Sequence, residues 1–394
     1  MKRLPLLLCI LLTGLVTPVF GKLDGTYMNE AGMTLKTPHA AWDEKGELPH
    51  KKILFIMQQT ASREIIELVQ RFPGFEYEVV LTANEHSIGA DDIYSNPIAG
   101  LSTADKHQEL ADKLAKDYDL VVVANVDFAI LPDEQKFRLM SMVRNGTGLV
   151  RIQSSEPWSE LKKLPYKKPY AKPLPRPEWV AGSNGLPGSR PENFESRIFN
   201  AWQFGHGRIV EVDYGAGYRA GVGLTPYFDY TTDWLFLYET SQAFLAQVLY
   251  YASGVELPAF SVRQDSGKFV VASPEKTTVE GRIRQTDNSV IRNSLDFTNL
   301  PAGKYTADVL VRRNGALVNF GAFPFTVESA FGAVSVEAPR LVQNRGPFSG
   351  TLKLASPAQN GYSVKVELMD APYRNVWFSK TLPLEAGKKE FPFD

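Results

Sequence analysis

Residues 119–152 read DLVVVANVDFAILPDEQKFRLMSMVRNGTGLVRI, and this stretch decides the fold of the first domain. Leu120–Ala124 is a run of leucine and valine that ends in alanine, as expected for a parallel strand buried on both faces. Pro132-Asp-Glu134 suits the first turn of a helix, where proline is tolerated and carboxylates favour the positive end of the helix dipole. Asn145-Gly146 is a typical left-handed helix end. Because Gly148–Ile152 is a second apolar run, the stretch predicts a strand–helix–strand unit.

The same alternation of strands and helices continues on both sides of this unit. Further strands are predicted at Ile53–Met57, Tyr77–Leu81 and Arg208–Asp213, and further helices at Ile65–Phe72, Asp105–Tyr118 and Asp233–Ala252. Such alternation favours a mostly parallel sheet that is covered by helices on both faces. We therefore expect a flavodoxin-like three-layer α/β domain over residues 50–256, preceded by an N-terminal extension over residues 22–49.

From about residue 259 the helical period gives way to the two-residue period of strands. Every second residue of Tyr305–Val311 is apolar, and Asn314-Gly315 then gives a strong hairpin signal. Leu300–Tyr305 resembles the turn-then-tyrosine entry of immunoglobulin-like and fibronectin-like sandwiches. We expect all-β sandwich domains at 259–330 and 333–394.

These boundaries carry two further expectations. A boundary near Pro258 predicts that residues 22–256 fold on their own. The second sandwich has about 60 residues against ~100 for a full sandwich, so we expect it to be incomplete and the chain to stop inside it.

The first 21 residues resemble a cleavable export signal. Lys2-Arg3 precedes a short apolar run over Leu6–Val16, and Val19 and Gly21 are small enough for the positions before a cleavage site. The run is shorter than the ~20 residues that a membrane span needs, although an uncleaved anchor is the alternative. We expect an exported protein, periplasmic or extracellular, with no membrane span after cleavage of the signal.

Charge and composition exclude several classes of function. The net charge is −1 with both signs interspersed, which argues against a nucleic-acid-binding protein. The one cysteine, Cys9, lies inside the signal, so the mature chain has neither a thiol nor a disulfide. The five histidines lack the paired spacing of metal ligands. We expect no metal and no cofactor, and the sequence contains no signal for the oligomeric state.

Four segments of the first domain resemble the class I glutamine amidotransferase-like fold, nearest its ThuA-like branch. They are Asp119–Val123, Leu131–Gln135, Asn145–Val150 and Phe204–Gly215. The resemblance covers about residues 50–254, and it implies a cleft at the strand ends. Active amidotransferases use a cysteine on a tight elbow after a strand, activated by a His–Glu pair. Here the corresponding strand is followed by Gln153-Ser-Ser-Glu156, so thiol-dependent glutamine hydrolysis is excluded.

Any ligand site is expected at the carboxyl edge of the first sheet, where open α/β sheets bind ligands. The residues that would line it follow the third, fourth and late strands: Asn125, Asp127, Gln153, Ser154, Glu156, Trp158 and Tyr214. The catalytic candidates are Ser154 or Ser155, with His206 as the base. No G-x-S-x-G elbow presents either serine. In the alternative interpretation the serines only satisfy backbone groups, and His206 lies at a hairpin tip between two glycines.

The loop at residues 161–191 is rich in proline, lysine and aromatic residues, and is either a lid over a ligand or a passive insertion.

Together these features predict an exported, non-catalytic binding or scaffold protein with a degenerate amidotransferase-like domain. The resemblance implies an accessory role in polysaccharide processing, with a carbohydrate ligand. Two alternatives stay open: a ThuA-like or serine-dependent enzyme acting on a sugar-related ligand, and a protein-interaction module of the cell envelope.

Overall fold

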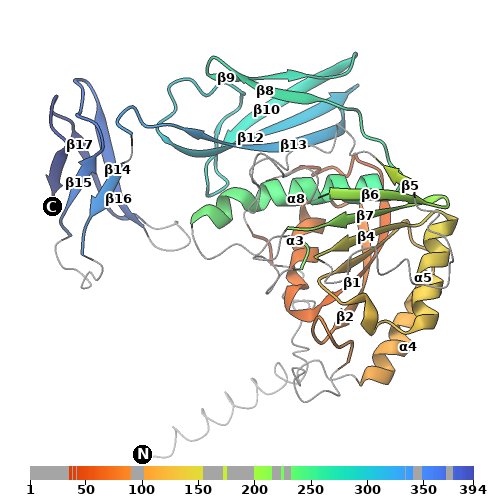
Figure 1. Cartoon of the computed structure of the whole chain (residues 1–394). Coiled ribbons are helices and arrows are strands. Elements are labelled where there is room, and N and C mark those ends of the chain that lie inside the picture. The colour runs from red at the N-terminus through yellow and green to blue at the C-terminus, as the bar shows by residue number, and fades with distance from the viewer. Residues whose placement is uncertain are drawn as a thin grey trace, which may run out of the picture.

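The structure is a computed structural model. It describes residues 35–37, 39–40, 42–89, 102–153, 172–174, 199–214, 223–225, 232–332, 334–339, 348–369 and 376–394. The predicted export signal and most of the loop at 161–191 lie outside these residues. Figure 1 shows the α/β domain, a first sandwich packed against its long helix α8 (Thr232–Ala252), and a second sandwich beyond it.

A seven-stranded sheet forms the centre of the first domain, in the order β2-β1-β3-β4-β7-β6-β5. The parallel strands are β1 (Lys51–Gln58), β2 (Phe75–Thr82), β3 (Leu120–Ala124), β4 (Gly148–Ile152) and β7 (Gly207–Val212). The antiparallel strands are β6 (Phe199–Phe204) and β5 (Lys172–Leu174). The predicted mostly parallel sheet is confirmed, and β3 and β4 have the predicted bounds because both are buried along their whole length.

Helices cover both faces of this sheet. They are α3 (Arg63–Arg71), α4 (Thr103–Leu114), α5 (Asp133–Asn145) and α8, with short 3₁₀ turns at η2 (Gln59–Ala61) and η4 (Phe128–Ile130). Alternate residues of β1 point to opposite sides, so Leu54 packs with α4 and α5 while Phe55 packs with α3 and α8. The helix predicted to start at Asp105 starts at Thr103, because the side chain of Ser102 accepts a hydrogen bond from Asp105 N–H and caps it.

The first sandwich has a four-stranded sheet, β11-β10-β12-β13, and the pair β8–β9. Its strands are β8 (Ser261–Asp265), β9 (Lys268–Ala272), β10 (Thr277–Arg284), β11 (Val290–Arg292), β12 (Gly303–Arg313) and β13 (Ala316–Val327). The predicted hairpin joins β12 to β13, with positive φ at Asn314 and Gly315. Tyr305 donates a hydrogen bond from its hydroxyl to the Pro301 carbonyl at 2.8 Å, as in the tyrosine corner of immunoglobulin-like domains.

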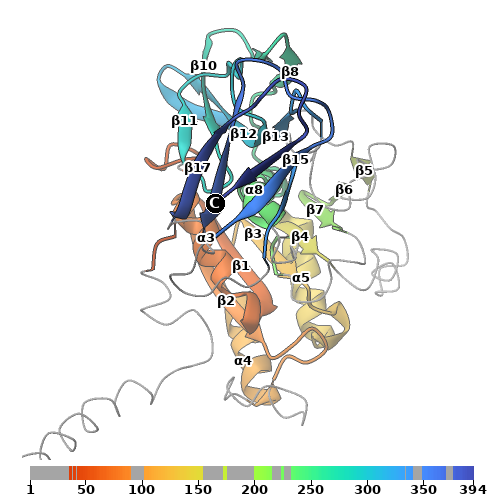
Figure 2. The same cartoon turned by 90° about the vertical axis from the view of Figure 1, so that its left-hand side faces the viewer.

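The second sandwich has the sheet β14-β15-β18 and the pair β16–β17. Its strands are β14 (Val334–Glu337), β15 (Gly350–Leu354), β16 (Ser363–Met369), β17 (Val376–Pro383) and β18 (Glu390–Phe393). They enclose a small core of their own that includes Leu352, Val366 and Phe391. Figure 2 views the molecule from this end, with the second sandwich in front.

The core of the first domain continues into the first sandwich. From Leu237 to Ala252 every residue of α8 except Tyr238 is buried, because the helix lies between the seven-stranded sheet and strands β12 and β13. Gln247 donates from Nε2 to the Phe320 carbonyl at 2.6 Å, and the Phe320 ring packs on Phe72 with a centroid distance of 5.0 Å. The sheet and the sandwich share one core, so we revise the expectation that residues 22–256 fold alone.

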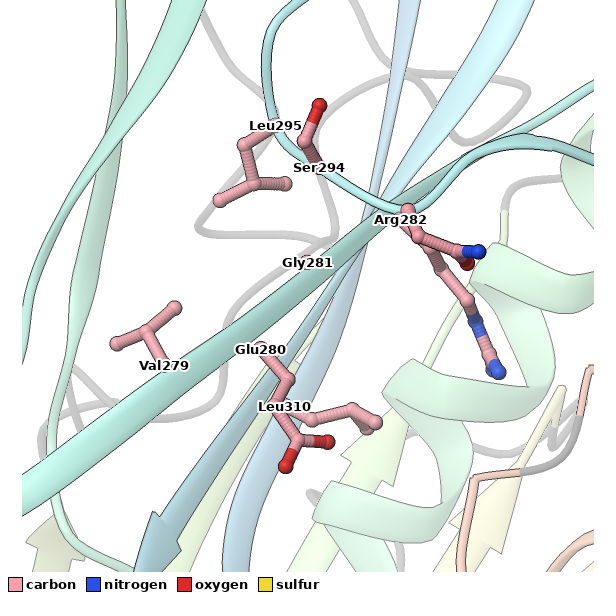
Figure 3. A pocket seen from close by; sticks show the side chains of 8 residues that line it. Val279, Glu280, Gly281, Arg282, Ser294, Leu295 and Leu310 are labelled. Carbon is pink, nitrogen blue, oxygen red and sulfur yellow. The ribbon is translucent and has the colours of Figure 1, made fainter.

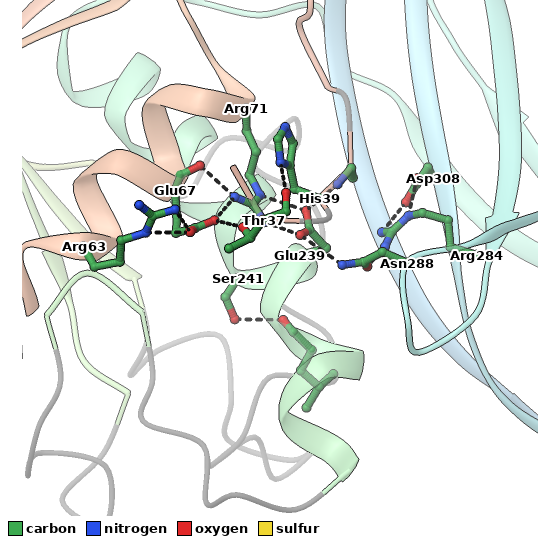
Figure 4. Close-up of polar contacts among 12 residues, drawn as sticks. Thr37, His39, Arg63, Glu67, Arg71, Glu239, Ser241, Arg284, Asn288 and Asp308 are labelled. Carbon is green, nitrogen blue, oxygen red and sulfur yellow. Dashed lines mark hydrogen bonds and ion pairs between the residues drawn. The ribbon is translucent and has the colours of Figure 1, made fainter. Parts of the chain in front are cut away.

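A buried ionic network extends from the first domain into the first sandwich (Figure 4). Arg71 of α3 forms ion pairs with Glu67 of the same helix and with Glu239 of α8, and the side chains of Arg71 and Glu239 are almost fully buried. On the sandwich side Arg284 forms an ion pair with Asp308 and a hydrogen bond with Asn288. The guanidinium of Arg71 loses water on burial, but attraction to Glu239 outweighs this loss and raises its pKa.

We predict that Phe320→Ala destabilises both domains together. Truncating a buried phenylalanine costs about 3–5 kcal/mol, and Phe320 contacts Phe72 of the first domain and Trp42 of the N-terminal extension. Urea unfolding, monitored by far-UV circular dichroism and by tryptophan fluorescence, should show the same single transition in both signals. The midpoint of this transition should lie at a lower urea concentration than in the wild type. Phe137→Ala is the control, because this side chain is 55% exposed. Loss of the sandwich signal with an unchanged transition of the α/β domain would contradict the shared core.

Candidate functional site at the carboxyl edge of the sheet

The parallel strands β1, β3, β4 and β7 end side by side, and hydrogen bonds join their ends. Gln58 donates from Nε2 to the Asn125 carbonyl at 2.9 Å, which ties the end of β1 to that of β3. The Asn125 N–H donates to Ile152 at 2.8 Å, and the Gln153 N–H donates to Val212 at 2.9 Å. The carboxyl edge is thus a continuous hydrogen-bonded rim.

Gln153 follows the end of β4 and has a left-handed backbone conformation. Its φ is 51°, in the left-handed region that residues other than glycine seldom adopt and that often marks a functional site. The side chain is buried, and its Oε1 accepts a hydrogen bond from the Tyr214 N–H at 2.5 Å. The side chain of Gln153 is an amide, which is not a nucleophile.

A short segment over Gly223–Thr225 closes one side of the rim. The Tyr214 hydroxyl donates to the Leu224 carbonyl at 3.0 Å. The backbone N–H groups of Leu224 and Thr225 each donate to the carboxylate of Glu64 at 2.7 Å, and the Thr225 hydroxyl donates to it at 2.9 Å. Glu64 lies in the first turn of α3, where the helix dipole favours an anion. Burial raises the pKa of Glu64, although these hydrogen bonds favour its charged form.

A histidine–carboxylate pair stands at the same edge. His86, in the loop after β2, forms a hydrogen bond from Nδ1 to Asp127 at 2.5 Å, and its Nε2 lies 2.9 Å from a Glu85 carboxylate oxygen. The backbone N–H of Asp127 donates to the Glu85 carbonyl at 2.8 Å, which joins the two loops. The hydrogen bond with Asp127 raises the pKa of His86, and the side chain is 65% exposed.

Four of the seven predicted ligand-binding residues lie at this edge: Asn125, Asp127, Gln153 and Tyr214. Ser154, Glu156 and Trp158, together with the candidate nucleophile Ser155, lie outside the described residues. Asn125, Gln153 and Tyr214 are buried, so their side chains contribute to the rim, whereas Asp127 is partly open to solvent.

The proposed base His206 lies elsewhere. It occupies the turn between β6 and β7, as the hairpin interpretation predicted, and its N–H donates to the Arg144 carbonyl at 2.9 Å. This turn precedes β7, so it is at the amino edge of the parallel strands, whereas Gln153 follows β4 at the carboxyl edge. The length of β4 therefore separates His206 from the residue that precedes Ser154.

Sequence reasoning missed Glu64, His86 and Thr225. The rule that ligand sites follow strand ends also covers the loop after β2, and it would have pointed to His86. Glu64 had only the weak signal of a carboxylate in a first helical turn. Nothing in the sequence links Thr225 to Glu64, because 160 residues separate them.

A separate hollow lies on β10 of the first sandwich, with a cavity volume of about 620 Å³. Figure 3 shows Val279, Leu295 and Leu310 with the polar Glu280 and Arg282 around it. Both charged residues have structural partners: Arg282 forms an ion pair with Asp308, and Glu280 with Arg312. The residues that line the hollow all belong to the first sandwich, and its two charged side chains are held by ion pairs within that domain.

The described part of the chain contains no group of three or more histidine, cysteine, aspartate and glutamate side chains that could hold a metal ion. Among the same residues, no helix has the length and apolar character that crossing a membrane requires. No protein-family model matches the chain, and no curated protein matches it either.

We predict that Asp127→Asn lowers the pKa of His86. Because the pKa of His86 is raised in the folded protein, the His86–Asp127 contact makes its full contribution to stability at a pH below the pKa of histidine in the unfolded chain. This contribution is lost as the pH rises through the pKa of His86 in the folded protein. An NMR titration of the His86 ring protons would report the change. Asp133→Asn is the control, since Asp133 is exposed and pairs with Lys136. An unchanged pKa in Asp127→Asn would show that the contact does not form in solution.

Proposed function

We propose that this is an exported, non-catalytic binding or scaffold protein with a degenerate amidotransferase-like domain, serving as an accessory to polysaccharide processing. The observation that carries the proposal is Gln153. Its backbone has a left-handed φ at the end of β4, the strand that the resemblance relates to the nucleophile, but its amide can neither attack a carbonyl nor be activated by a base. The side chain is also fixed by its bond with Tyr214, so it supports the rim.

A neutral, hydroxyl-rich ligand suits the chemistry of this edge. The described groups that are open to solvent at this edge include the His86–Asp127 pair, and the nearest anion-binding N–H groups are already occupied by Glu64. Sugars are recognised by such groups, because each hydroxyl both donates and accepts a hydrogen bond. The resemblance to the ThuA-like branch and the attached sandwiches support the same class of ligand.

A serine-dependent hydrolase is the second candidate, and the His86–Asp127 pair favours it. Asp127 would orient the imidazole as the carboxylate of a catalytic triad does. His86 is at the same edge as Gln153, which directly precedes Ser154, so it replaces His206 as the base in this hypothesis.

We predict that the full chain binds at least one polysaccharide on a glycan array and releases no product from it. Asp127→Ala should weaken binding about tenfold, the effect of losing one hydrogen bond to a charged group. Asp133→Ala is the matched control. Reducing ends released by the wild type and lost in His86→Ala would replace the non-catalytic proposal with the hydrolase. Binding to no glycan would overturn the carbohydrate assignment.

A further inference from the structure

The second sandwich carries an exposed tryptophan at an irregular point of its smaller sheet. Strands β16 and β17 pair antiparallel, with Glu367 opposite Ser379 and Leu368 opposite Phe378. The next pair is Met369 with Val376, so Trp377 is an extra residue on β17, a β-bulge. Its side chain is 70% exposed. Bulges redirect a side chain and are frequent beside functional sites.

The exposure of Trp377 places its ring on the outer side of this pair. Phe378 and Leu382 of β17 pack with the core, so Ser379 and Thr381, which alternate with them, point outward. Both of these residues are exposed, as is Val376, which precedes Trp377.

Polar side chains of β16 complete the same face. Glu367 lies opposite Ser379, whose hydroxyl is 3.4 Å from its carboxylate, and Lys365 forms an ion pair with Glu367. The described part of this face thus presents one flat aromatic ring beside a hydroxyl, a carboxylate and an ammonium group.

We infer that Trp377 is a stacking platform for a sugar ring of a polysaccharide, with Glu367 and Ser379 as hydrogen-bonding partners; the choice of ligand rests on the proposed function. The C–H face of a pyranose packs on an indole, and its hydroxyls reach the polar side chains around the ring. A protein partner would need an apolar cluster around the tryptophan, and a phosphorylated ligand an arginine cluster. Among the described residues of this face, Ser379, Thr381, Lys365 and Glu367 are polar and none is an arginine, and Val376 is the exposed apolar residue next to Trp377.

The test is affinity electrophoresis of the full chain in gels that contain β-glucan, xylan or galactomannan, followed by calorimetry with the polysaccharide that retards it. Trp377→Ala should weaken binding about tenfold, the effect of removing one stacked ring, and Trp377→Phe should keep part of it. Tyr362→Ala is the matched control. Tyr362 is a 46% exposed aromatic residue of the same sandwich, but it packs against Phe331.

The outcomes separate the two proposals. Weaker binding in Trp377→Ala, with an unchanged circular dichroism spectrum and with Tyr362→Ala like wild type, supports the platform. Binding that Trp377→Ala leaves intact and Asp127→Ala weakens would overturn the platform while the proposed function stands. No retardation in any gel would overturn both. Self-association lost in Trp377→Ala without an effect on polysaccharide binding would assign the tryptophan to a protein contact and overturn the platform.

Discussion

The ion pair between Arg71 and Glu239 constrains the assembly of the first two domains. Both side chains are removed from water, and a buried charge is tolerated only when it is paired and hydrogen-bonded. Glu239 also accepts a hydrogen bond from the Ala40 N–H, and Asn288 of the sandwich is within reach of it. The N-terminal extension, α3, α8 and the first sandwich must therefore come together around one carboxylate. These partners account for the burial of Glu239, the first of four consecutive buried polar residues of α8, Glu239–Gln242.

The sequence predicted the elements of the fold much better than their assembly. Buried parallel strands are mainly apolar, and β3 is a continuous apolar run while β4 is interrupted only by Arg151, so both could be located to the residue. β5 and β6 were missed, because β5 has only three residues within the proline-rich segment and β6 has no continuous apolar run. The burial of Glu239–Gln242 was not predictable, since polar residues normally face water and the groups that surround these come from distant segments.

At the candidate site, too, the sequence predicted the positions of residues better than the contacts between them. The rule that ligands bind at strand ends brought Asn125, Asp127, Gln153 and Tyr214 to one edge. The rule does not say which of these side chains are consumed by the rim itself, because that depends on hydrogen bonds between residues far apart in sequence. The left-handed φ of Gln153 and the contact of His86 with Asp127 likewise depend on how distant segments meet, so the sequence did not predict them.

The two edge strands of the seven-stranded sheet differ in length, and both have features that hinder the addition of further strands. β5 is only three residues long and has a proline at its centre, so one backbone N–H is missing from that edge. At the other edge, β2 carries Glu76 and Glu78, and the Lys113 ammonium group occupies the Val79 carbonyl. Short strands, prolines and charges are the means by which proteins prevent strands of another copy from adding to a sheet. These features of the two edge strands hinder the addition of a strand from another copy to this sheet.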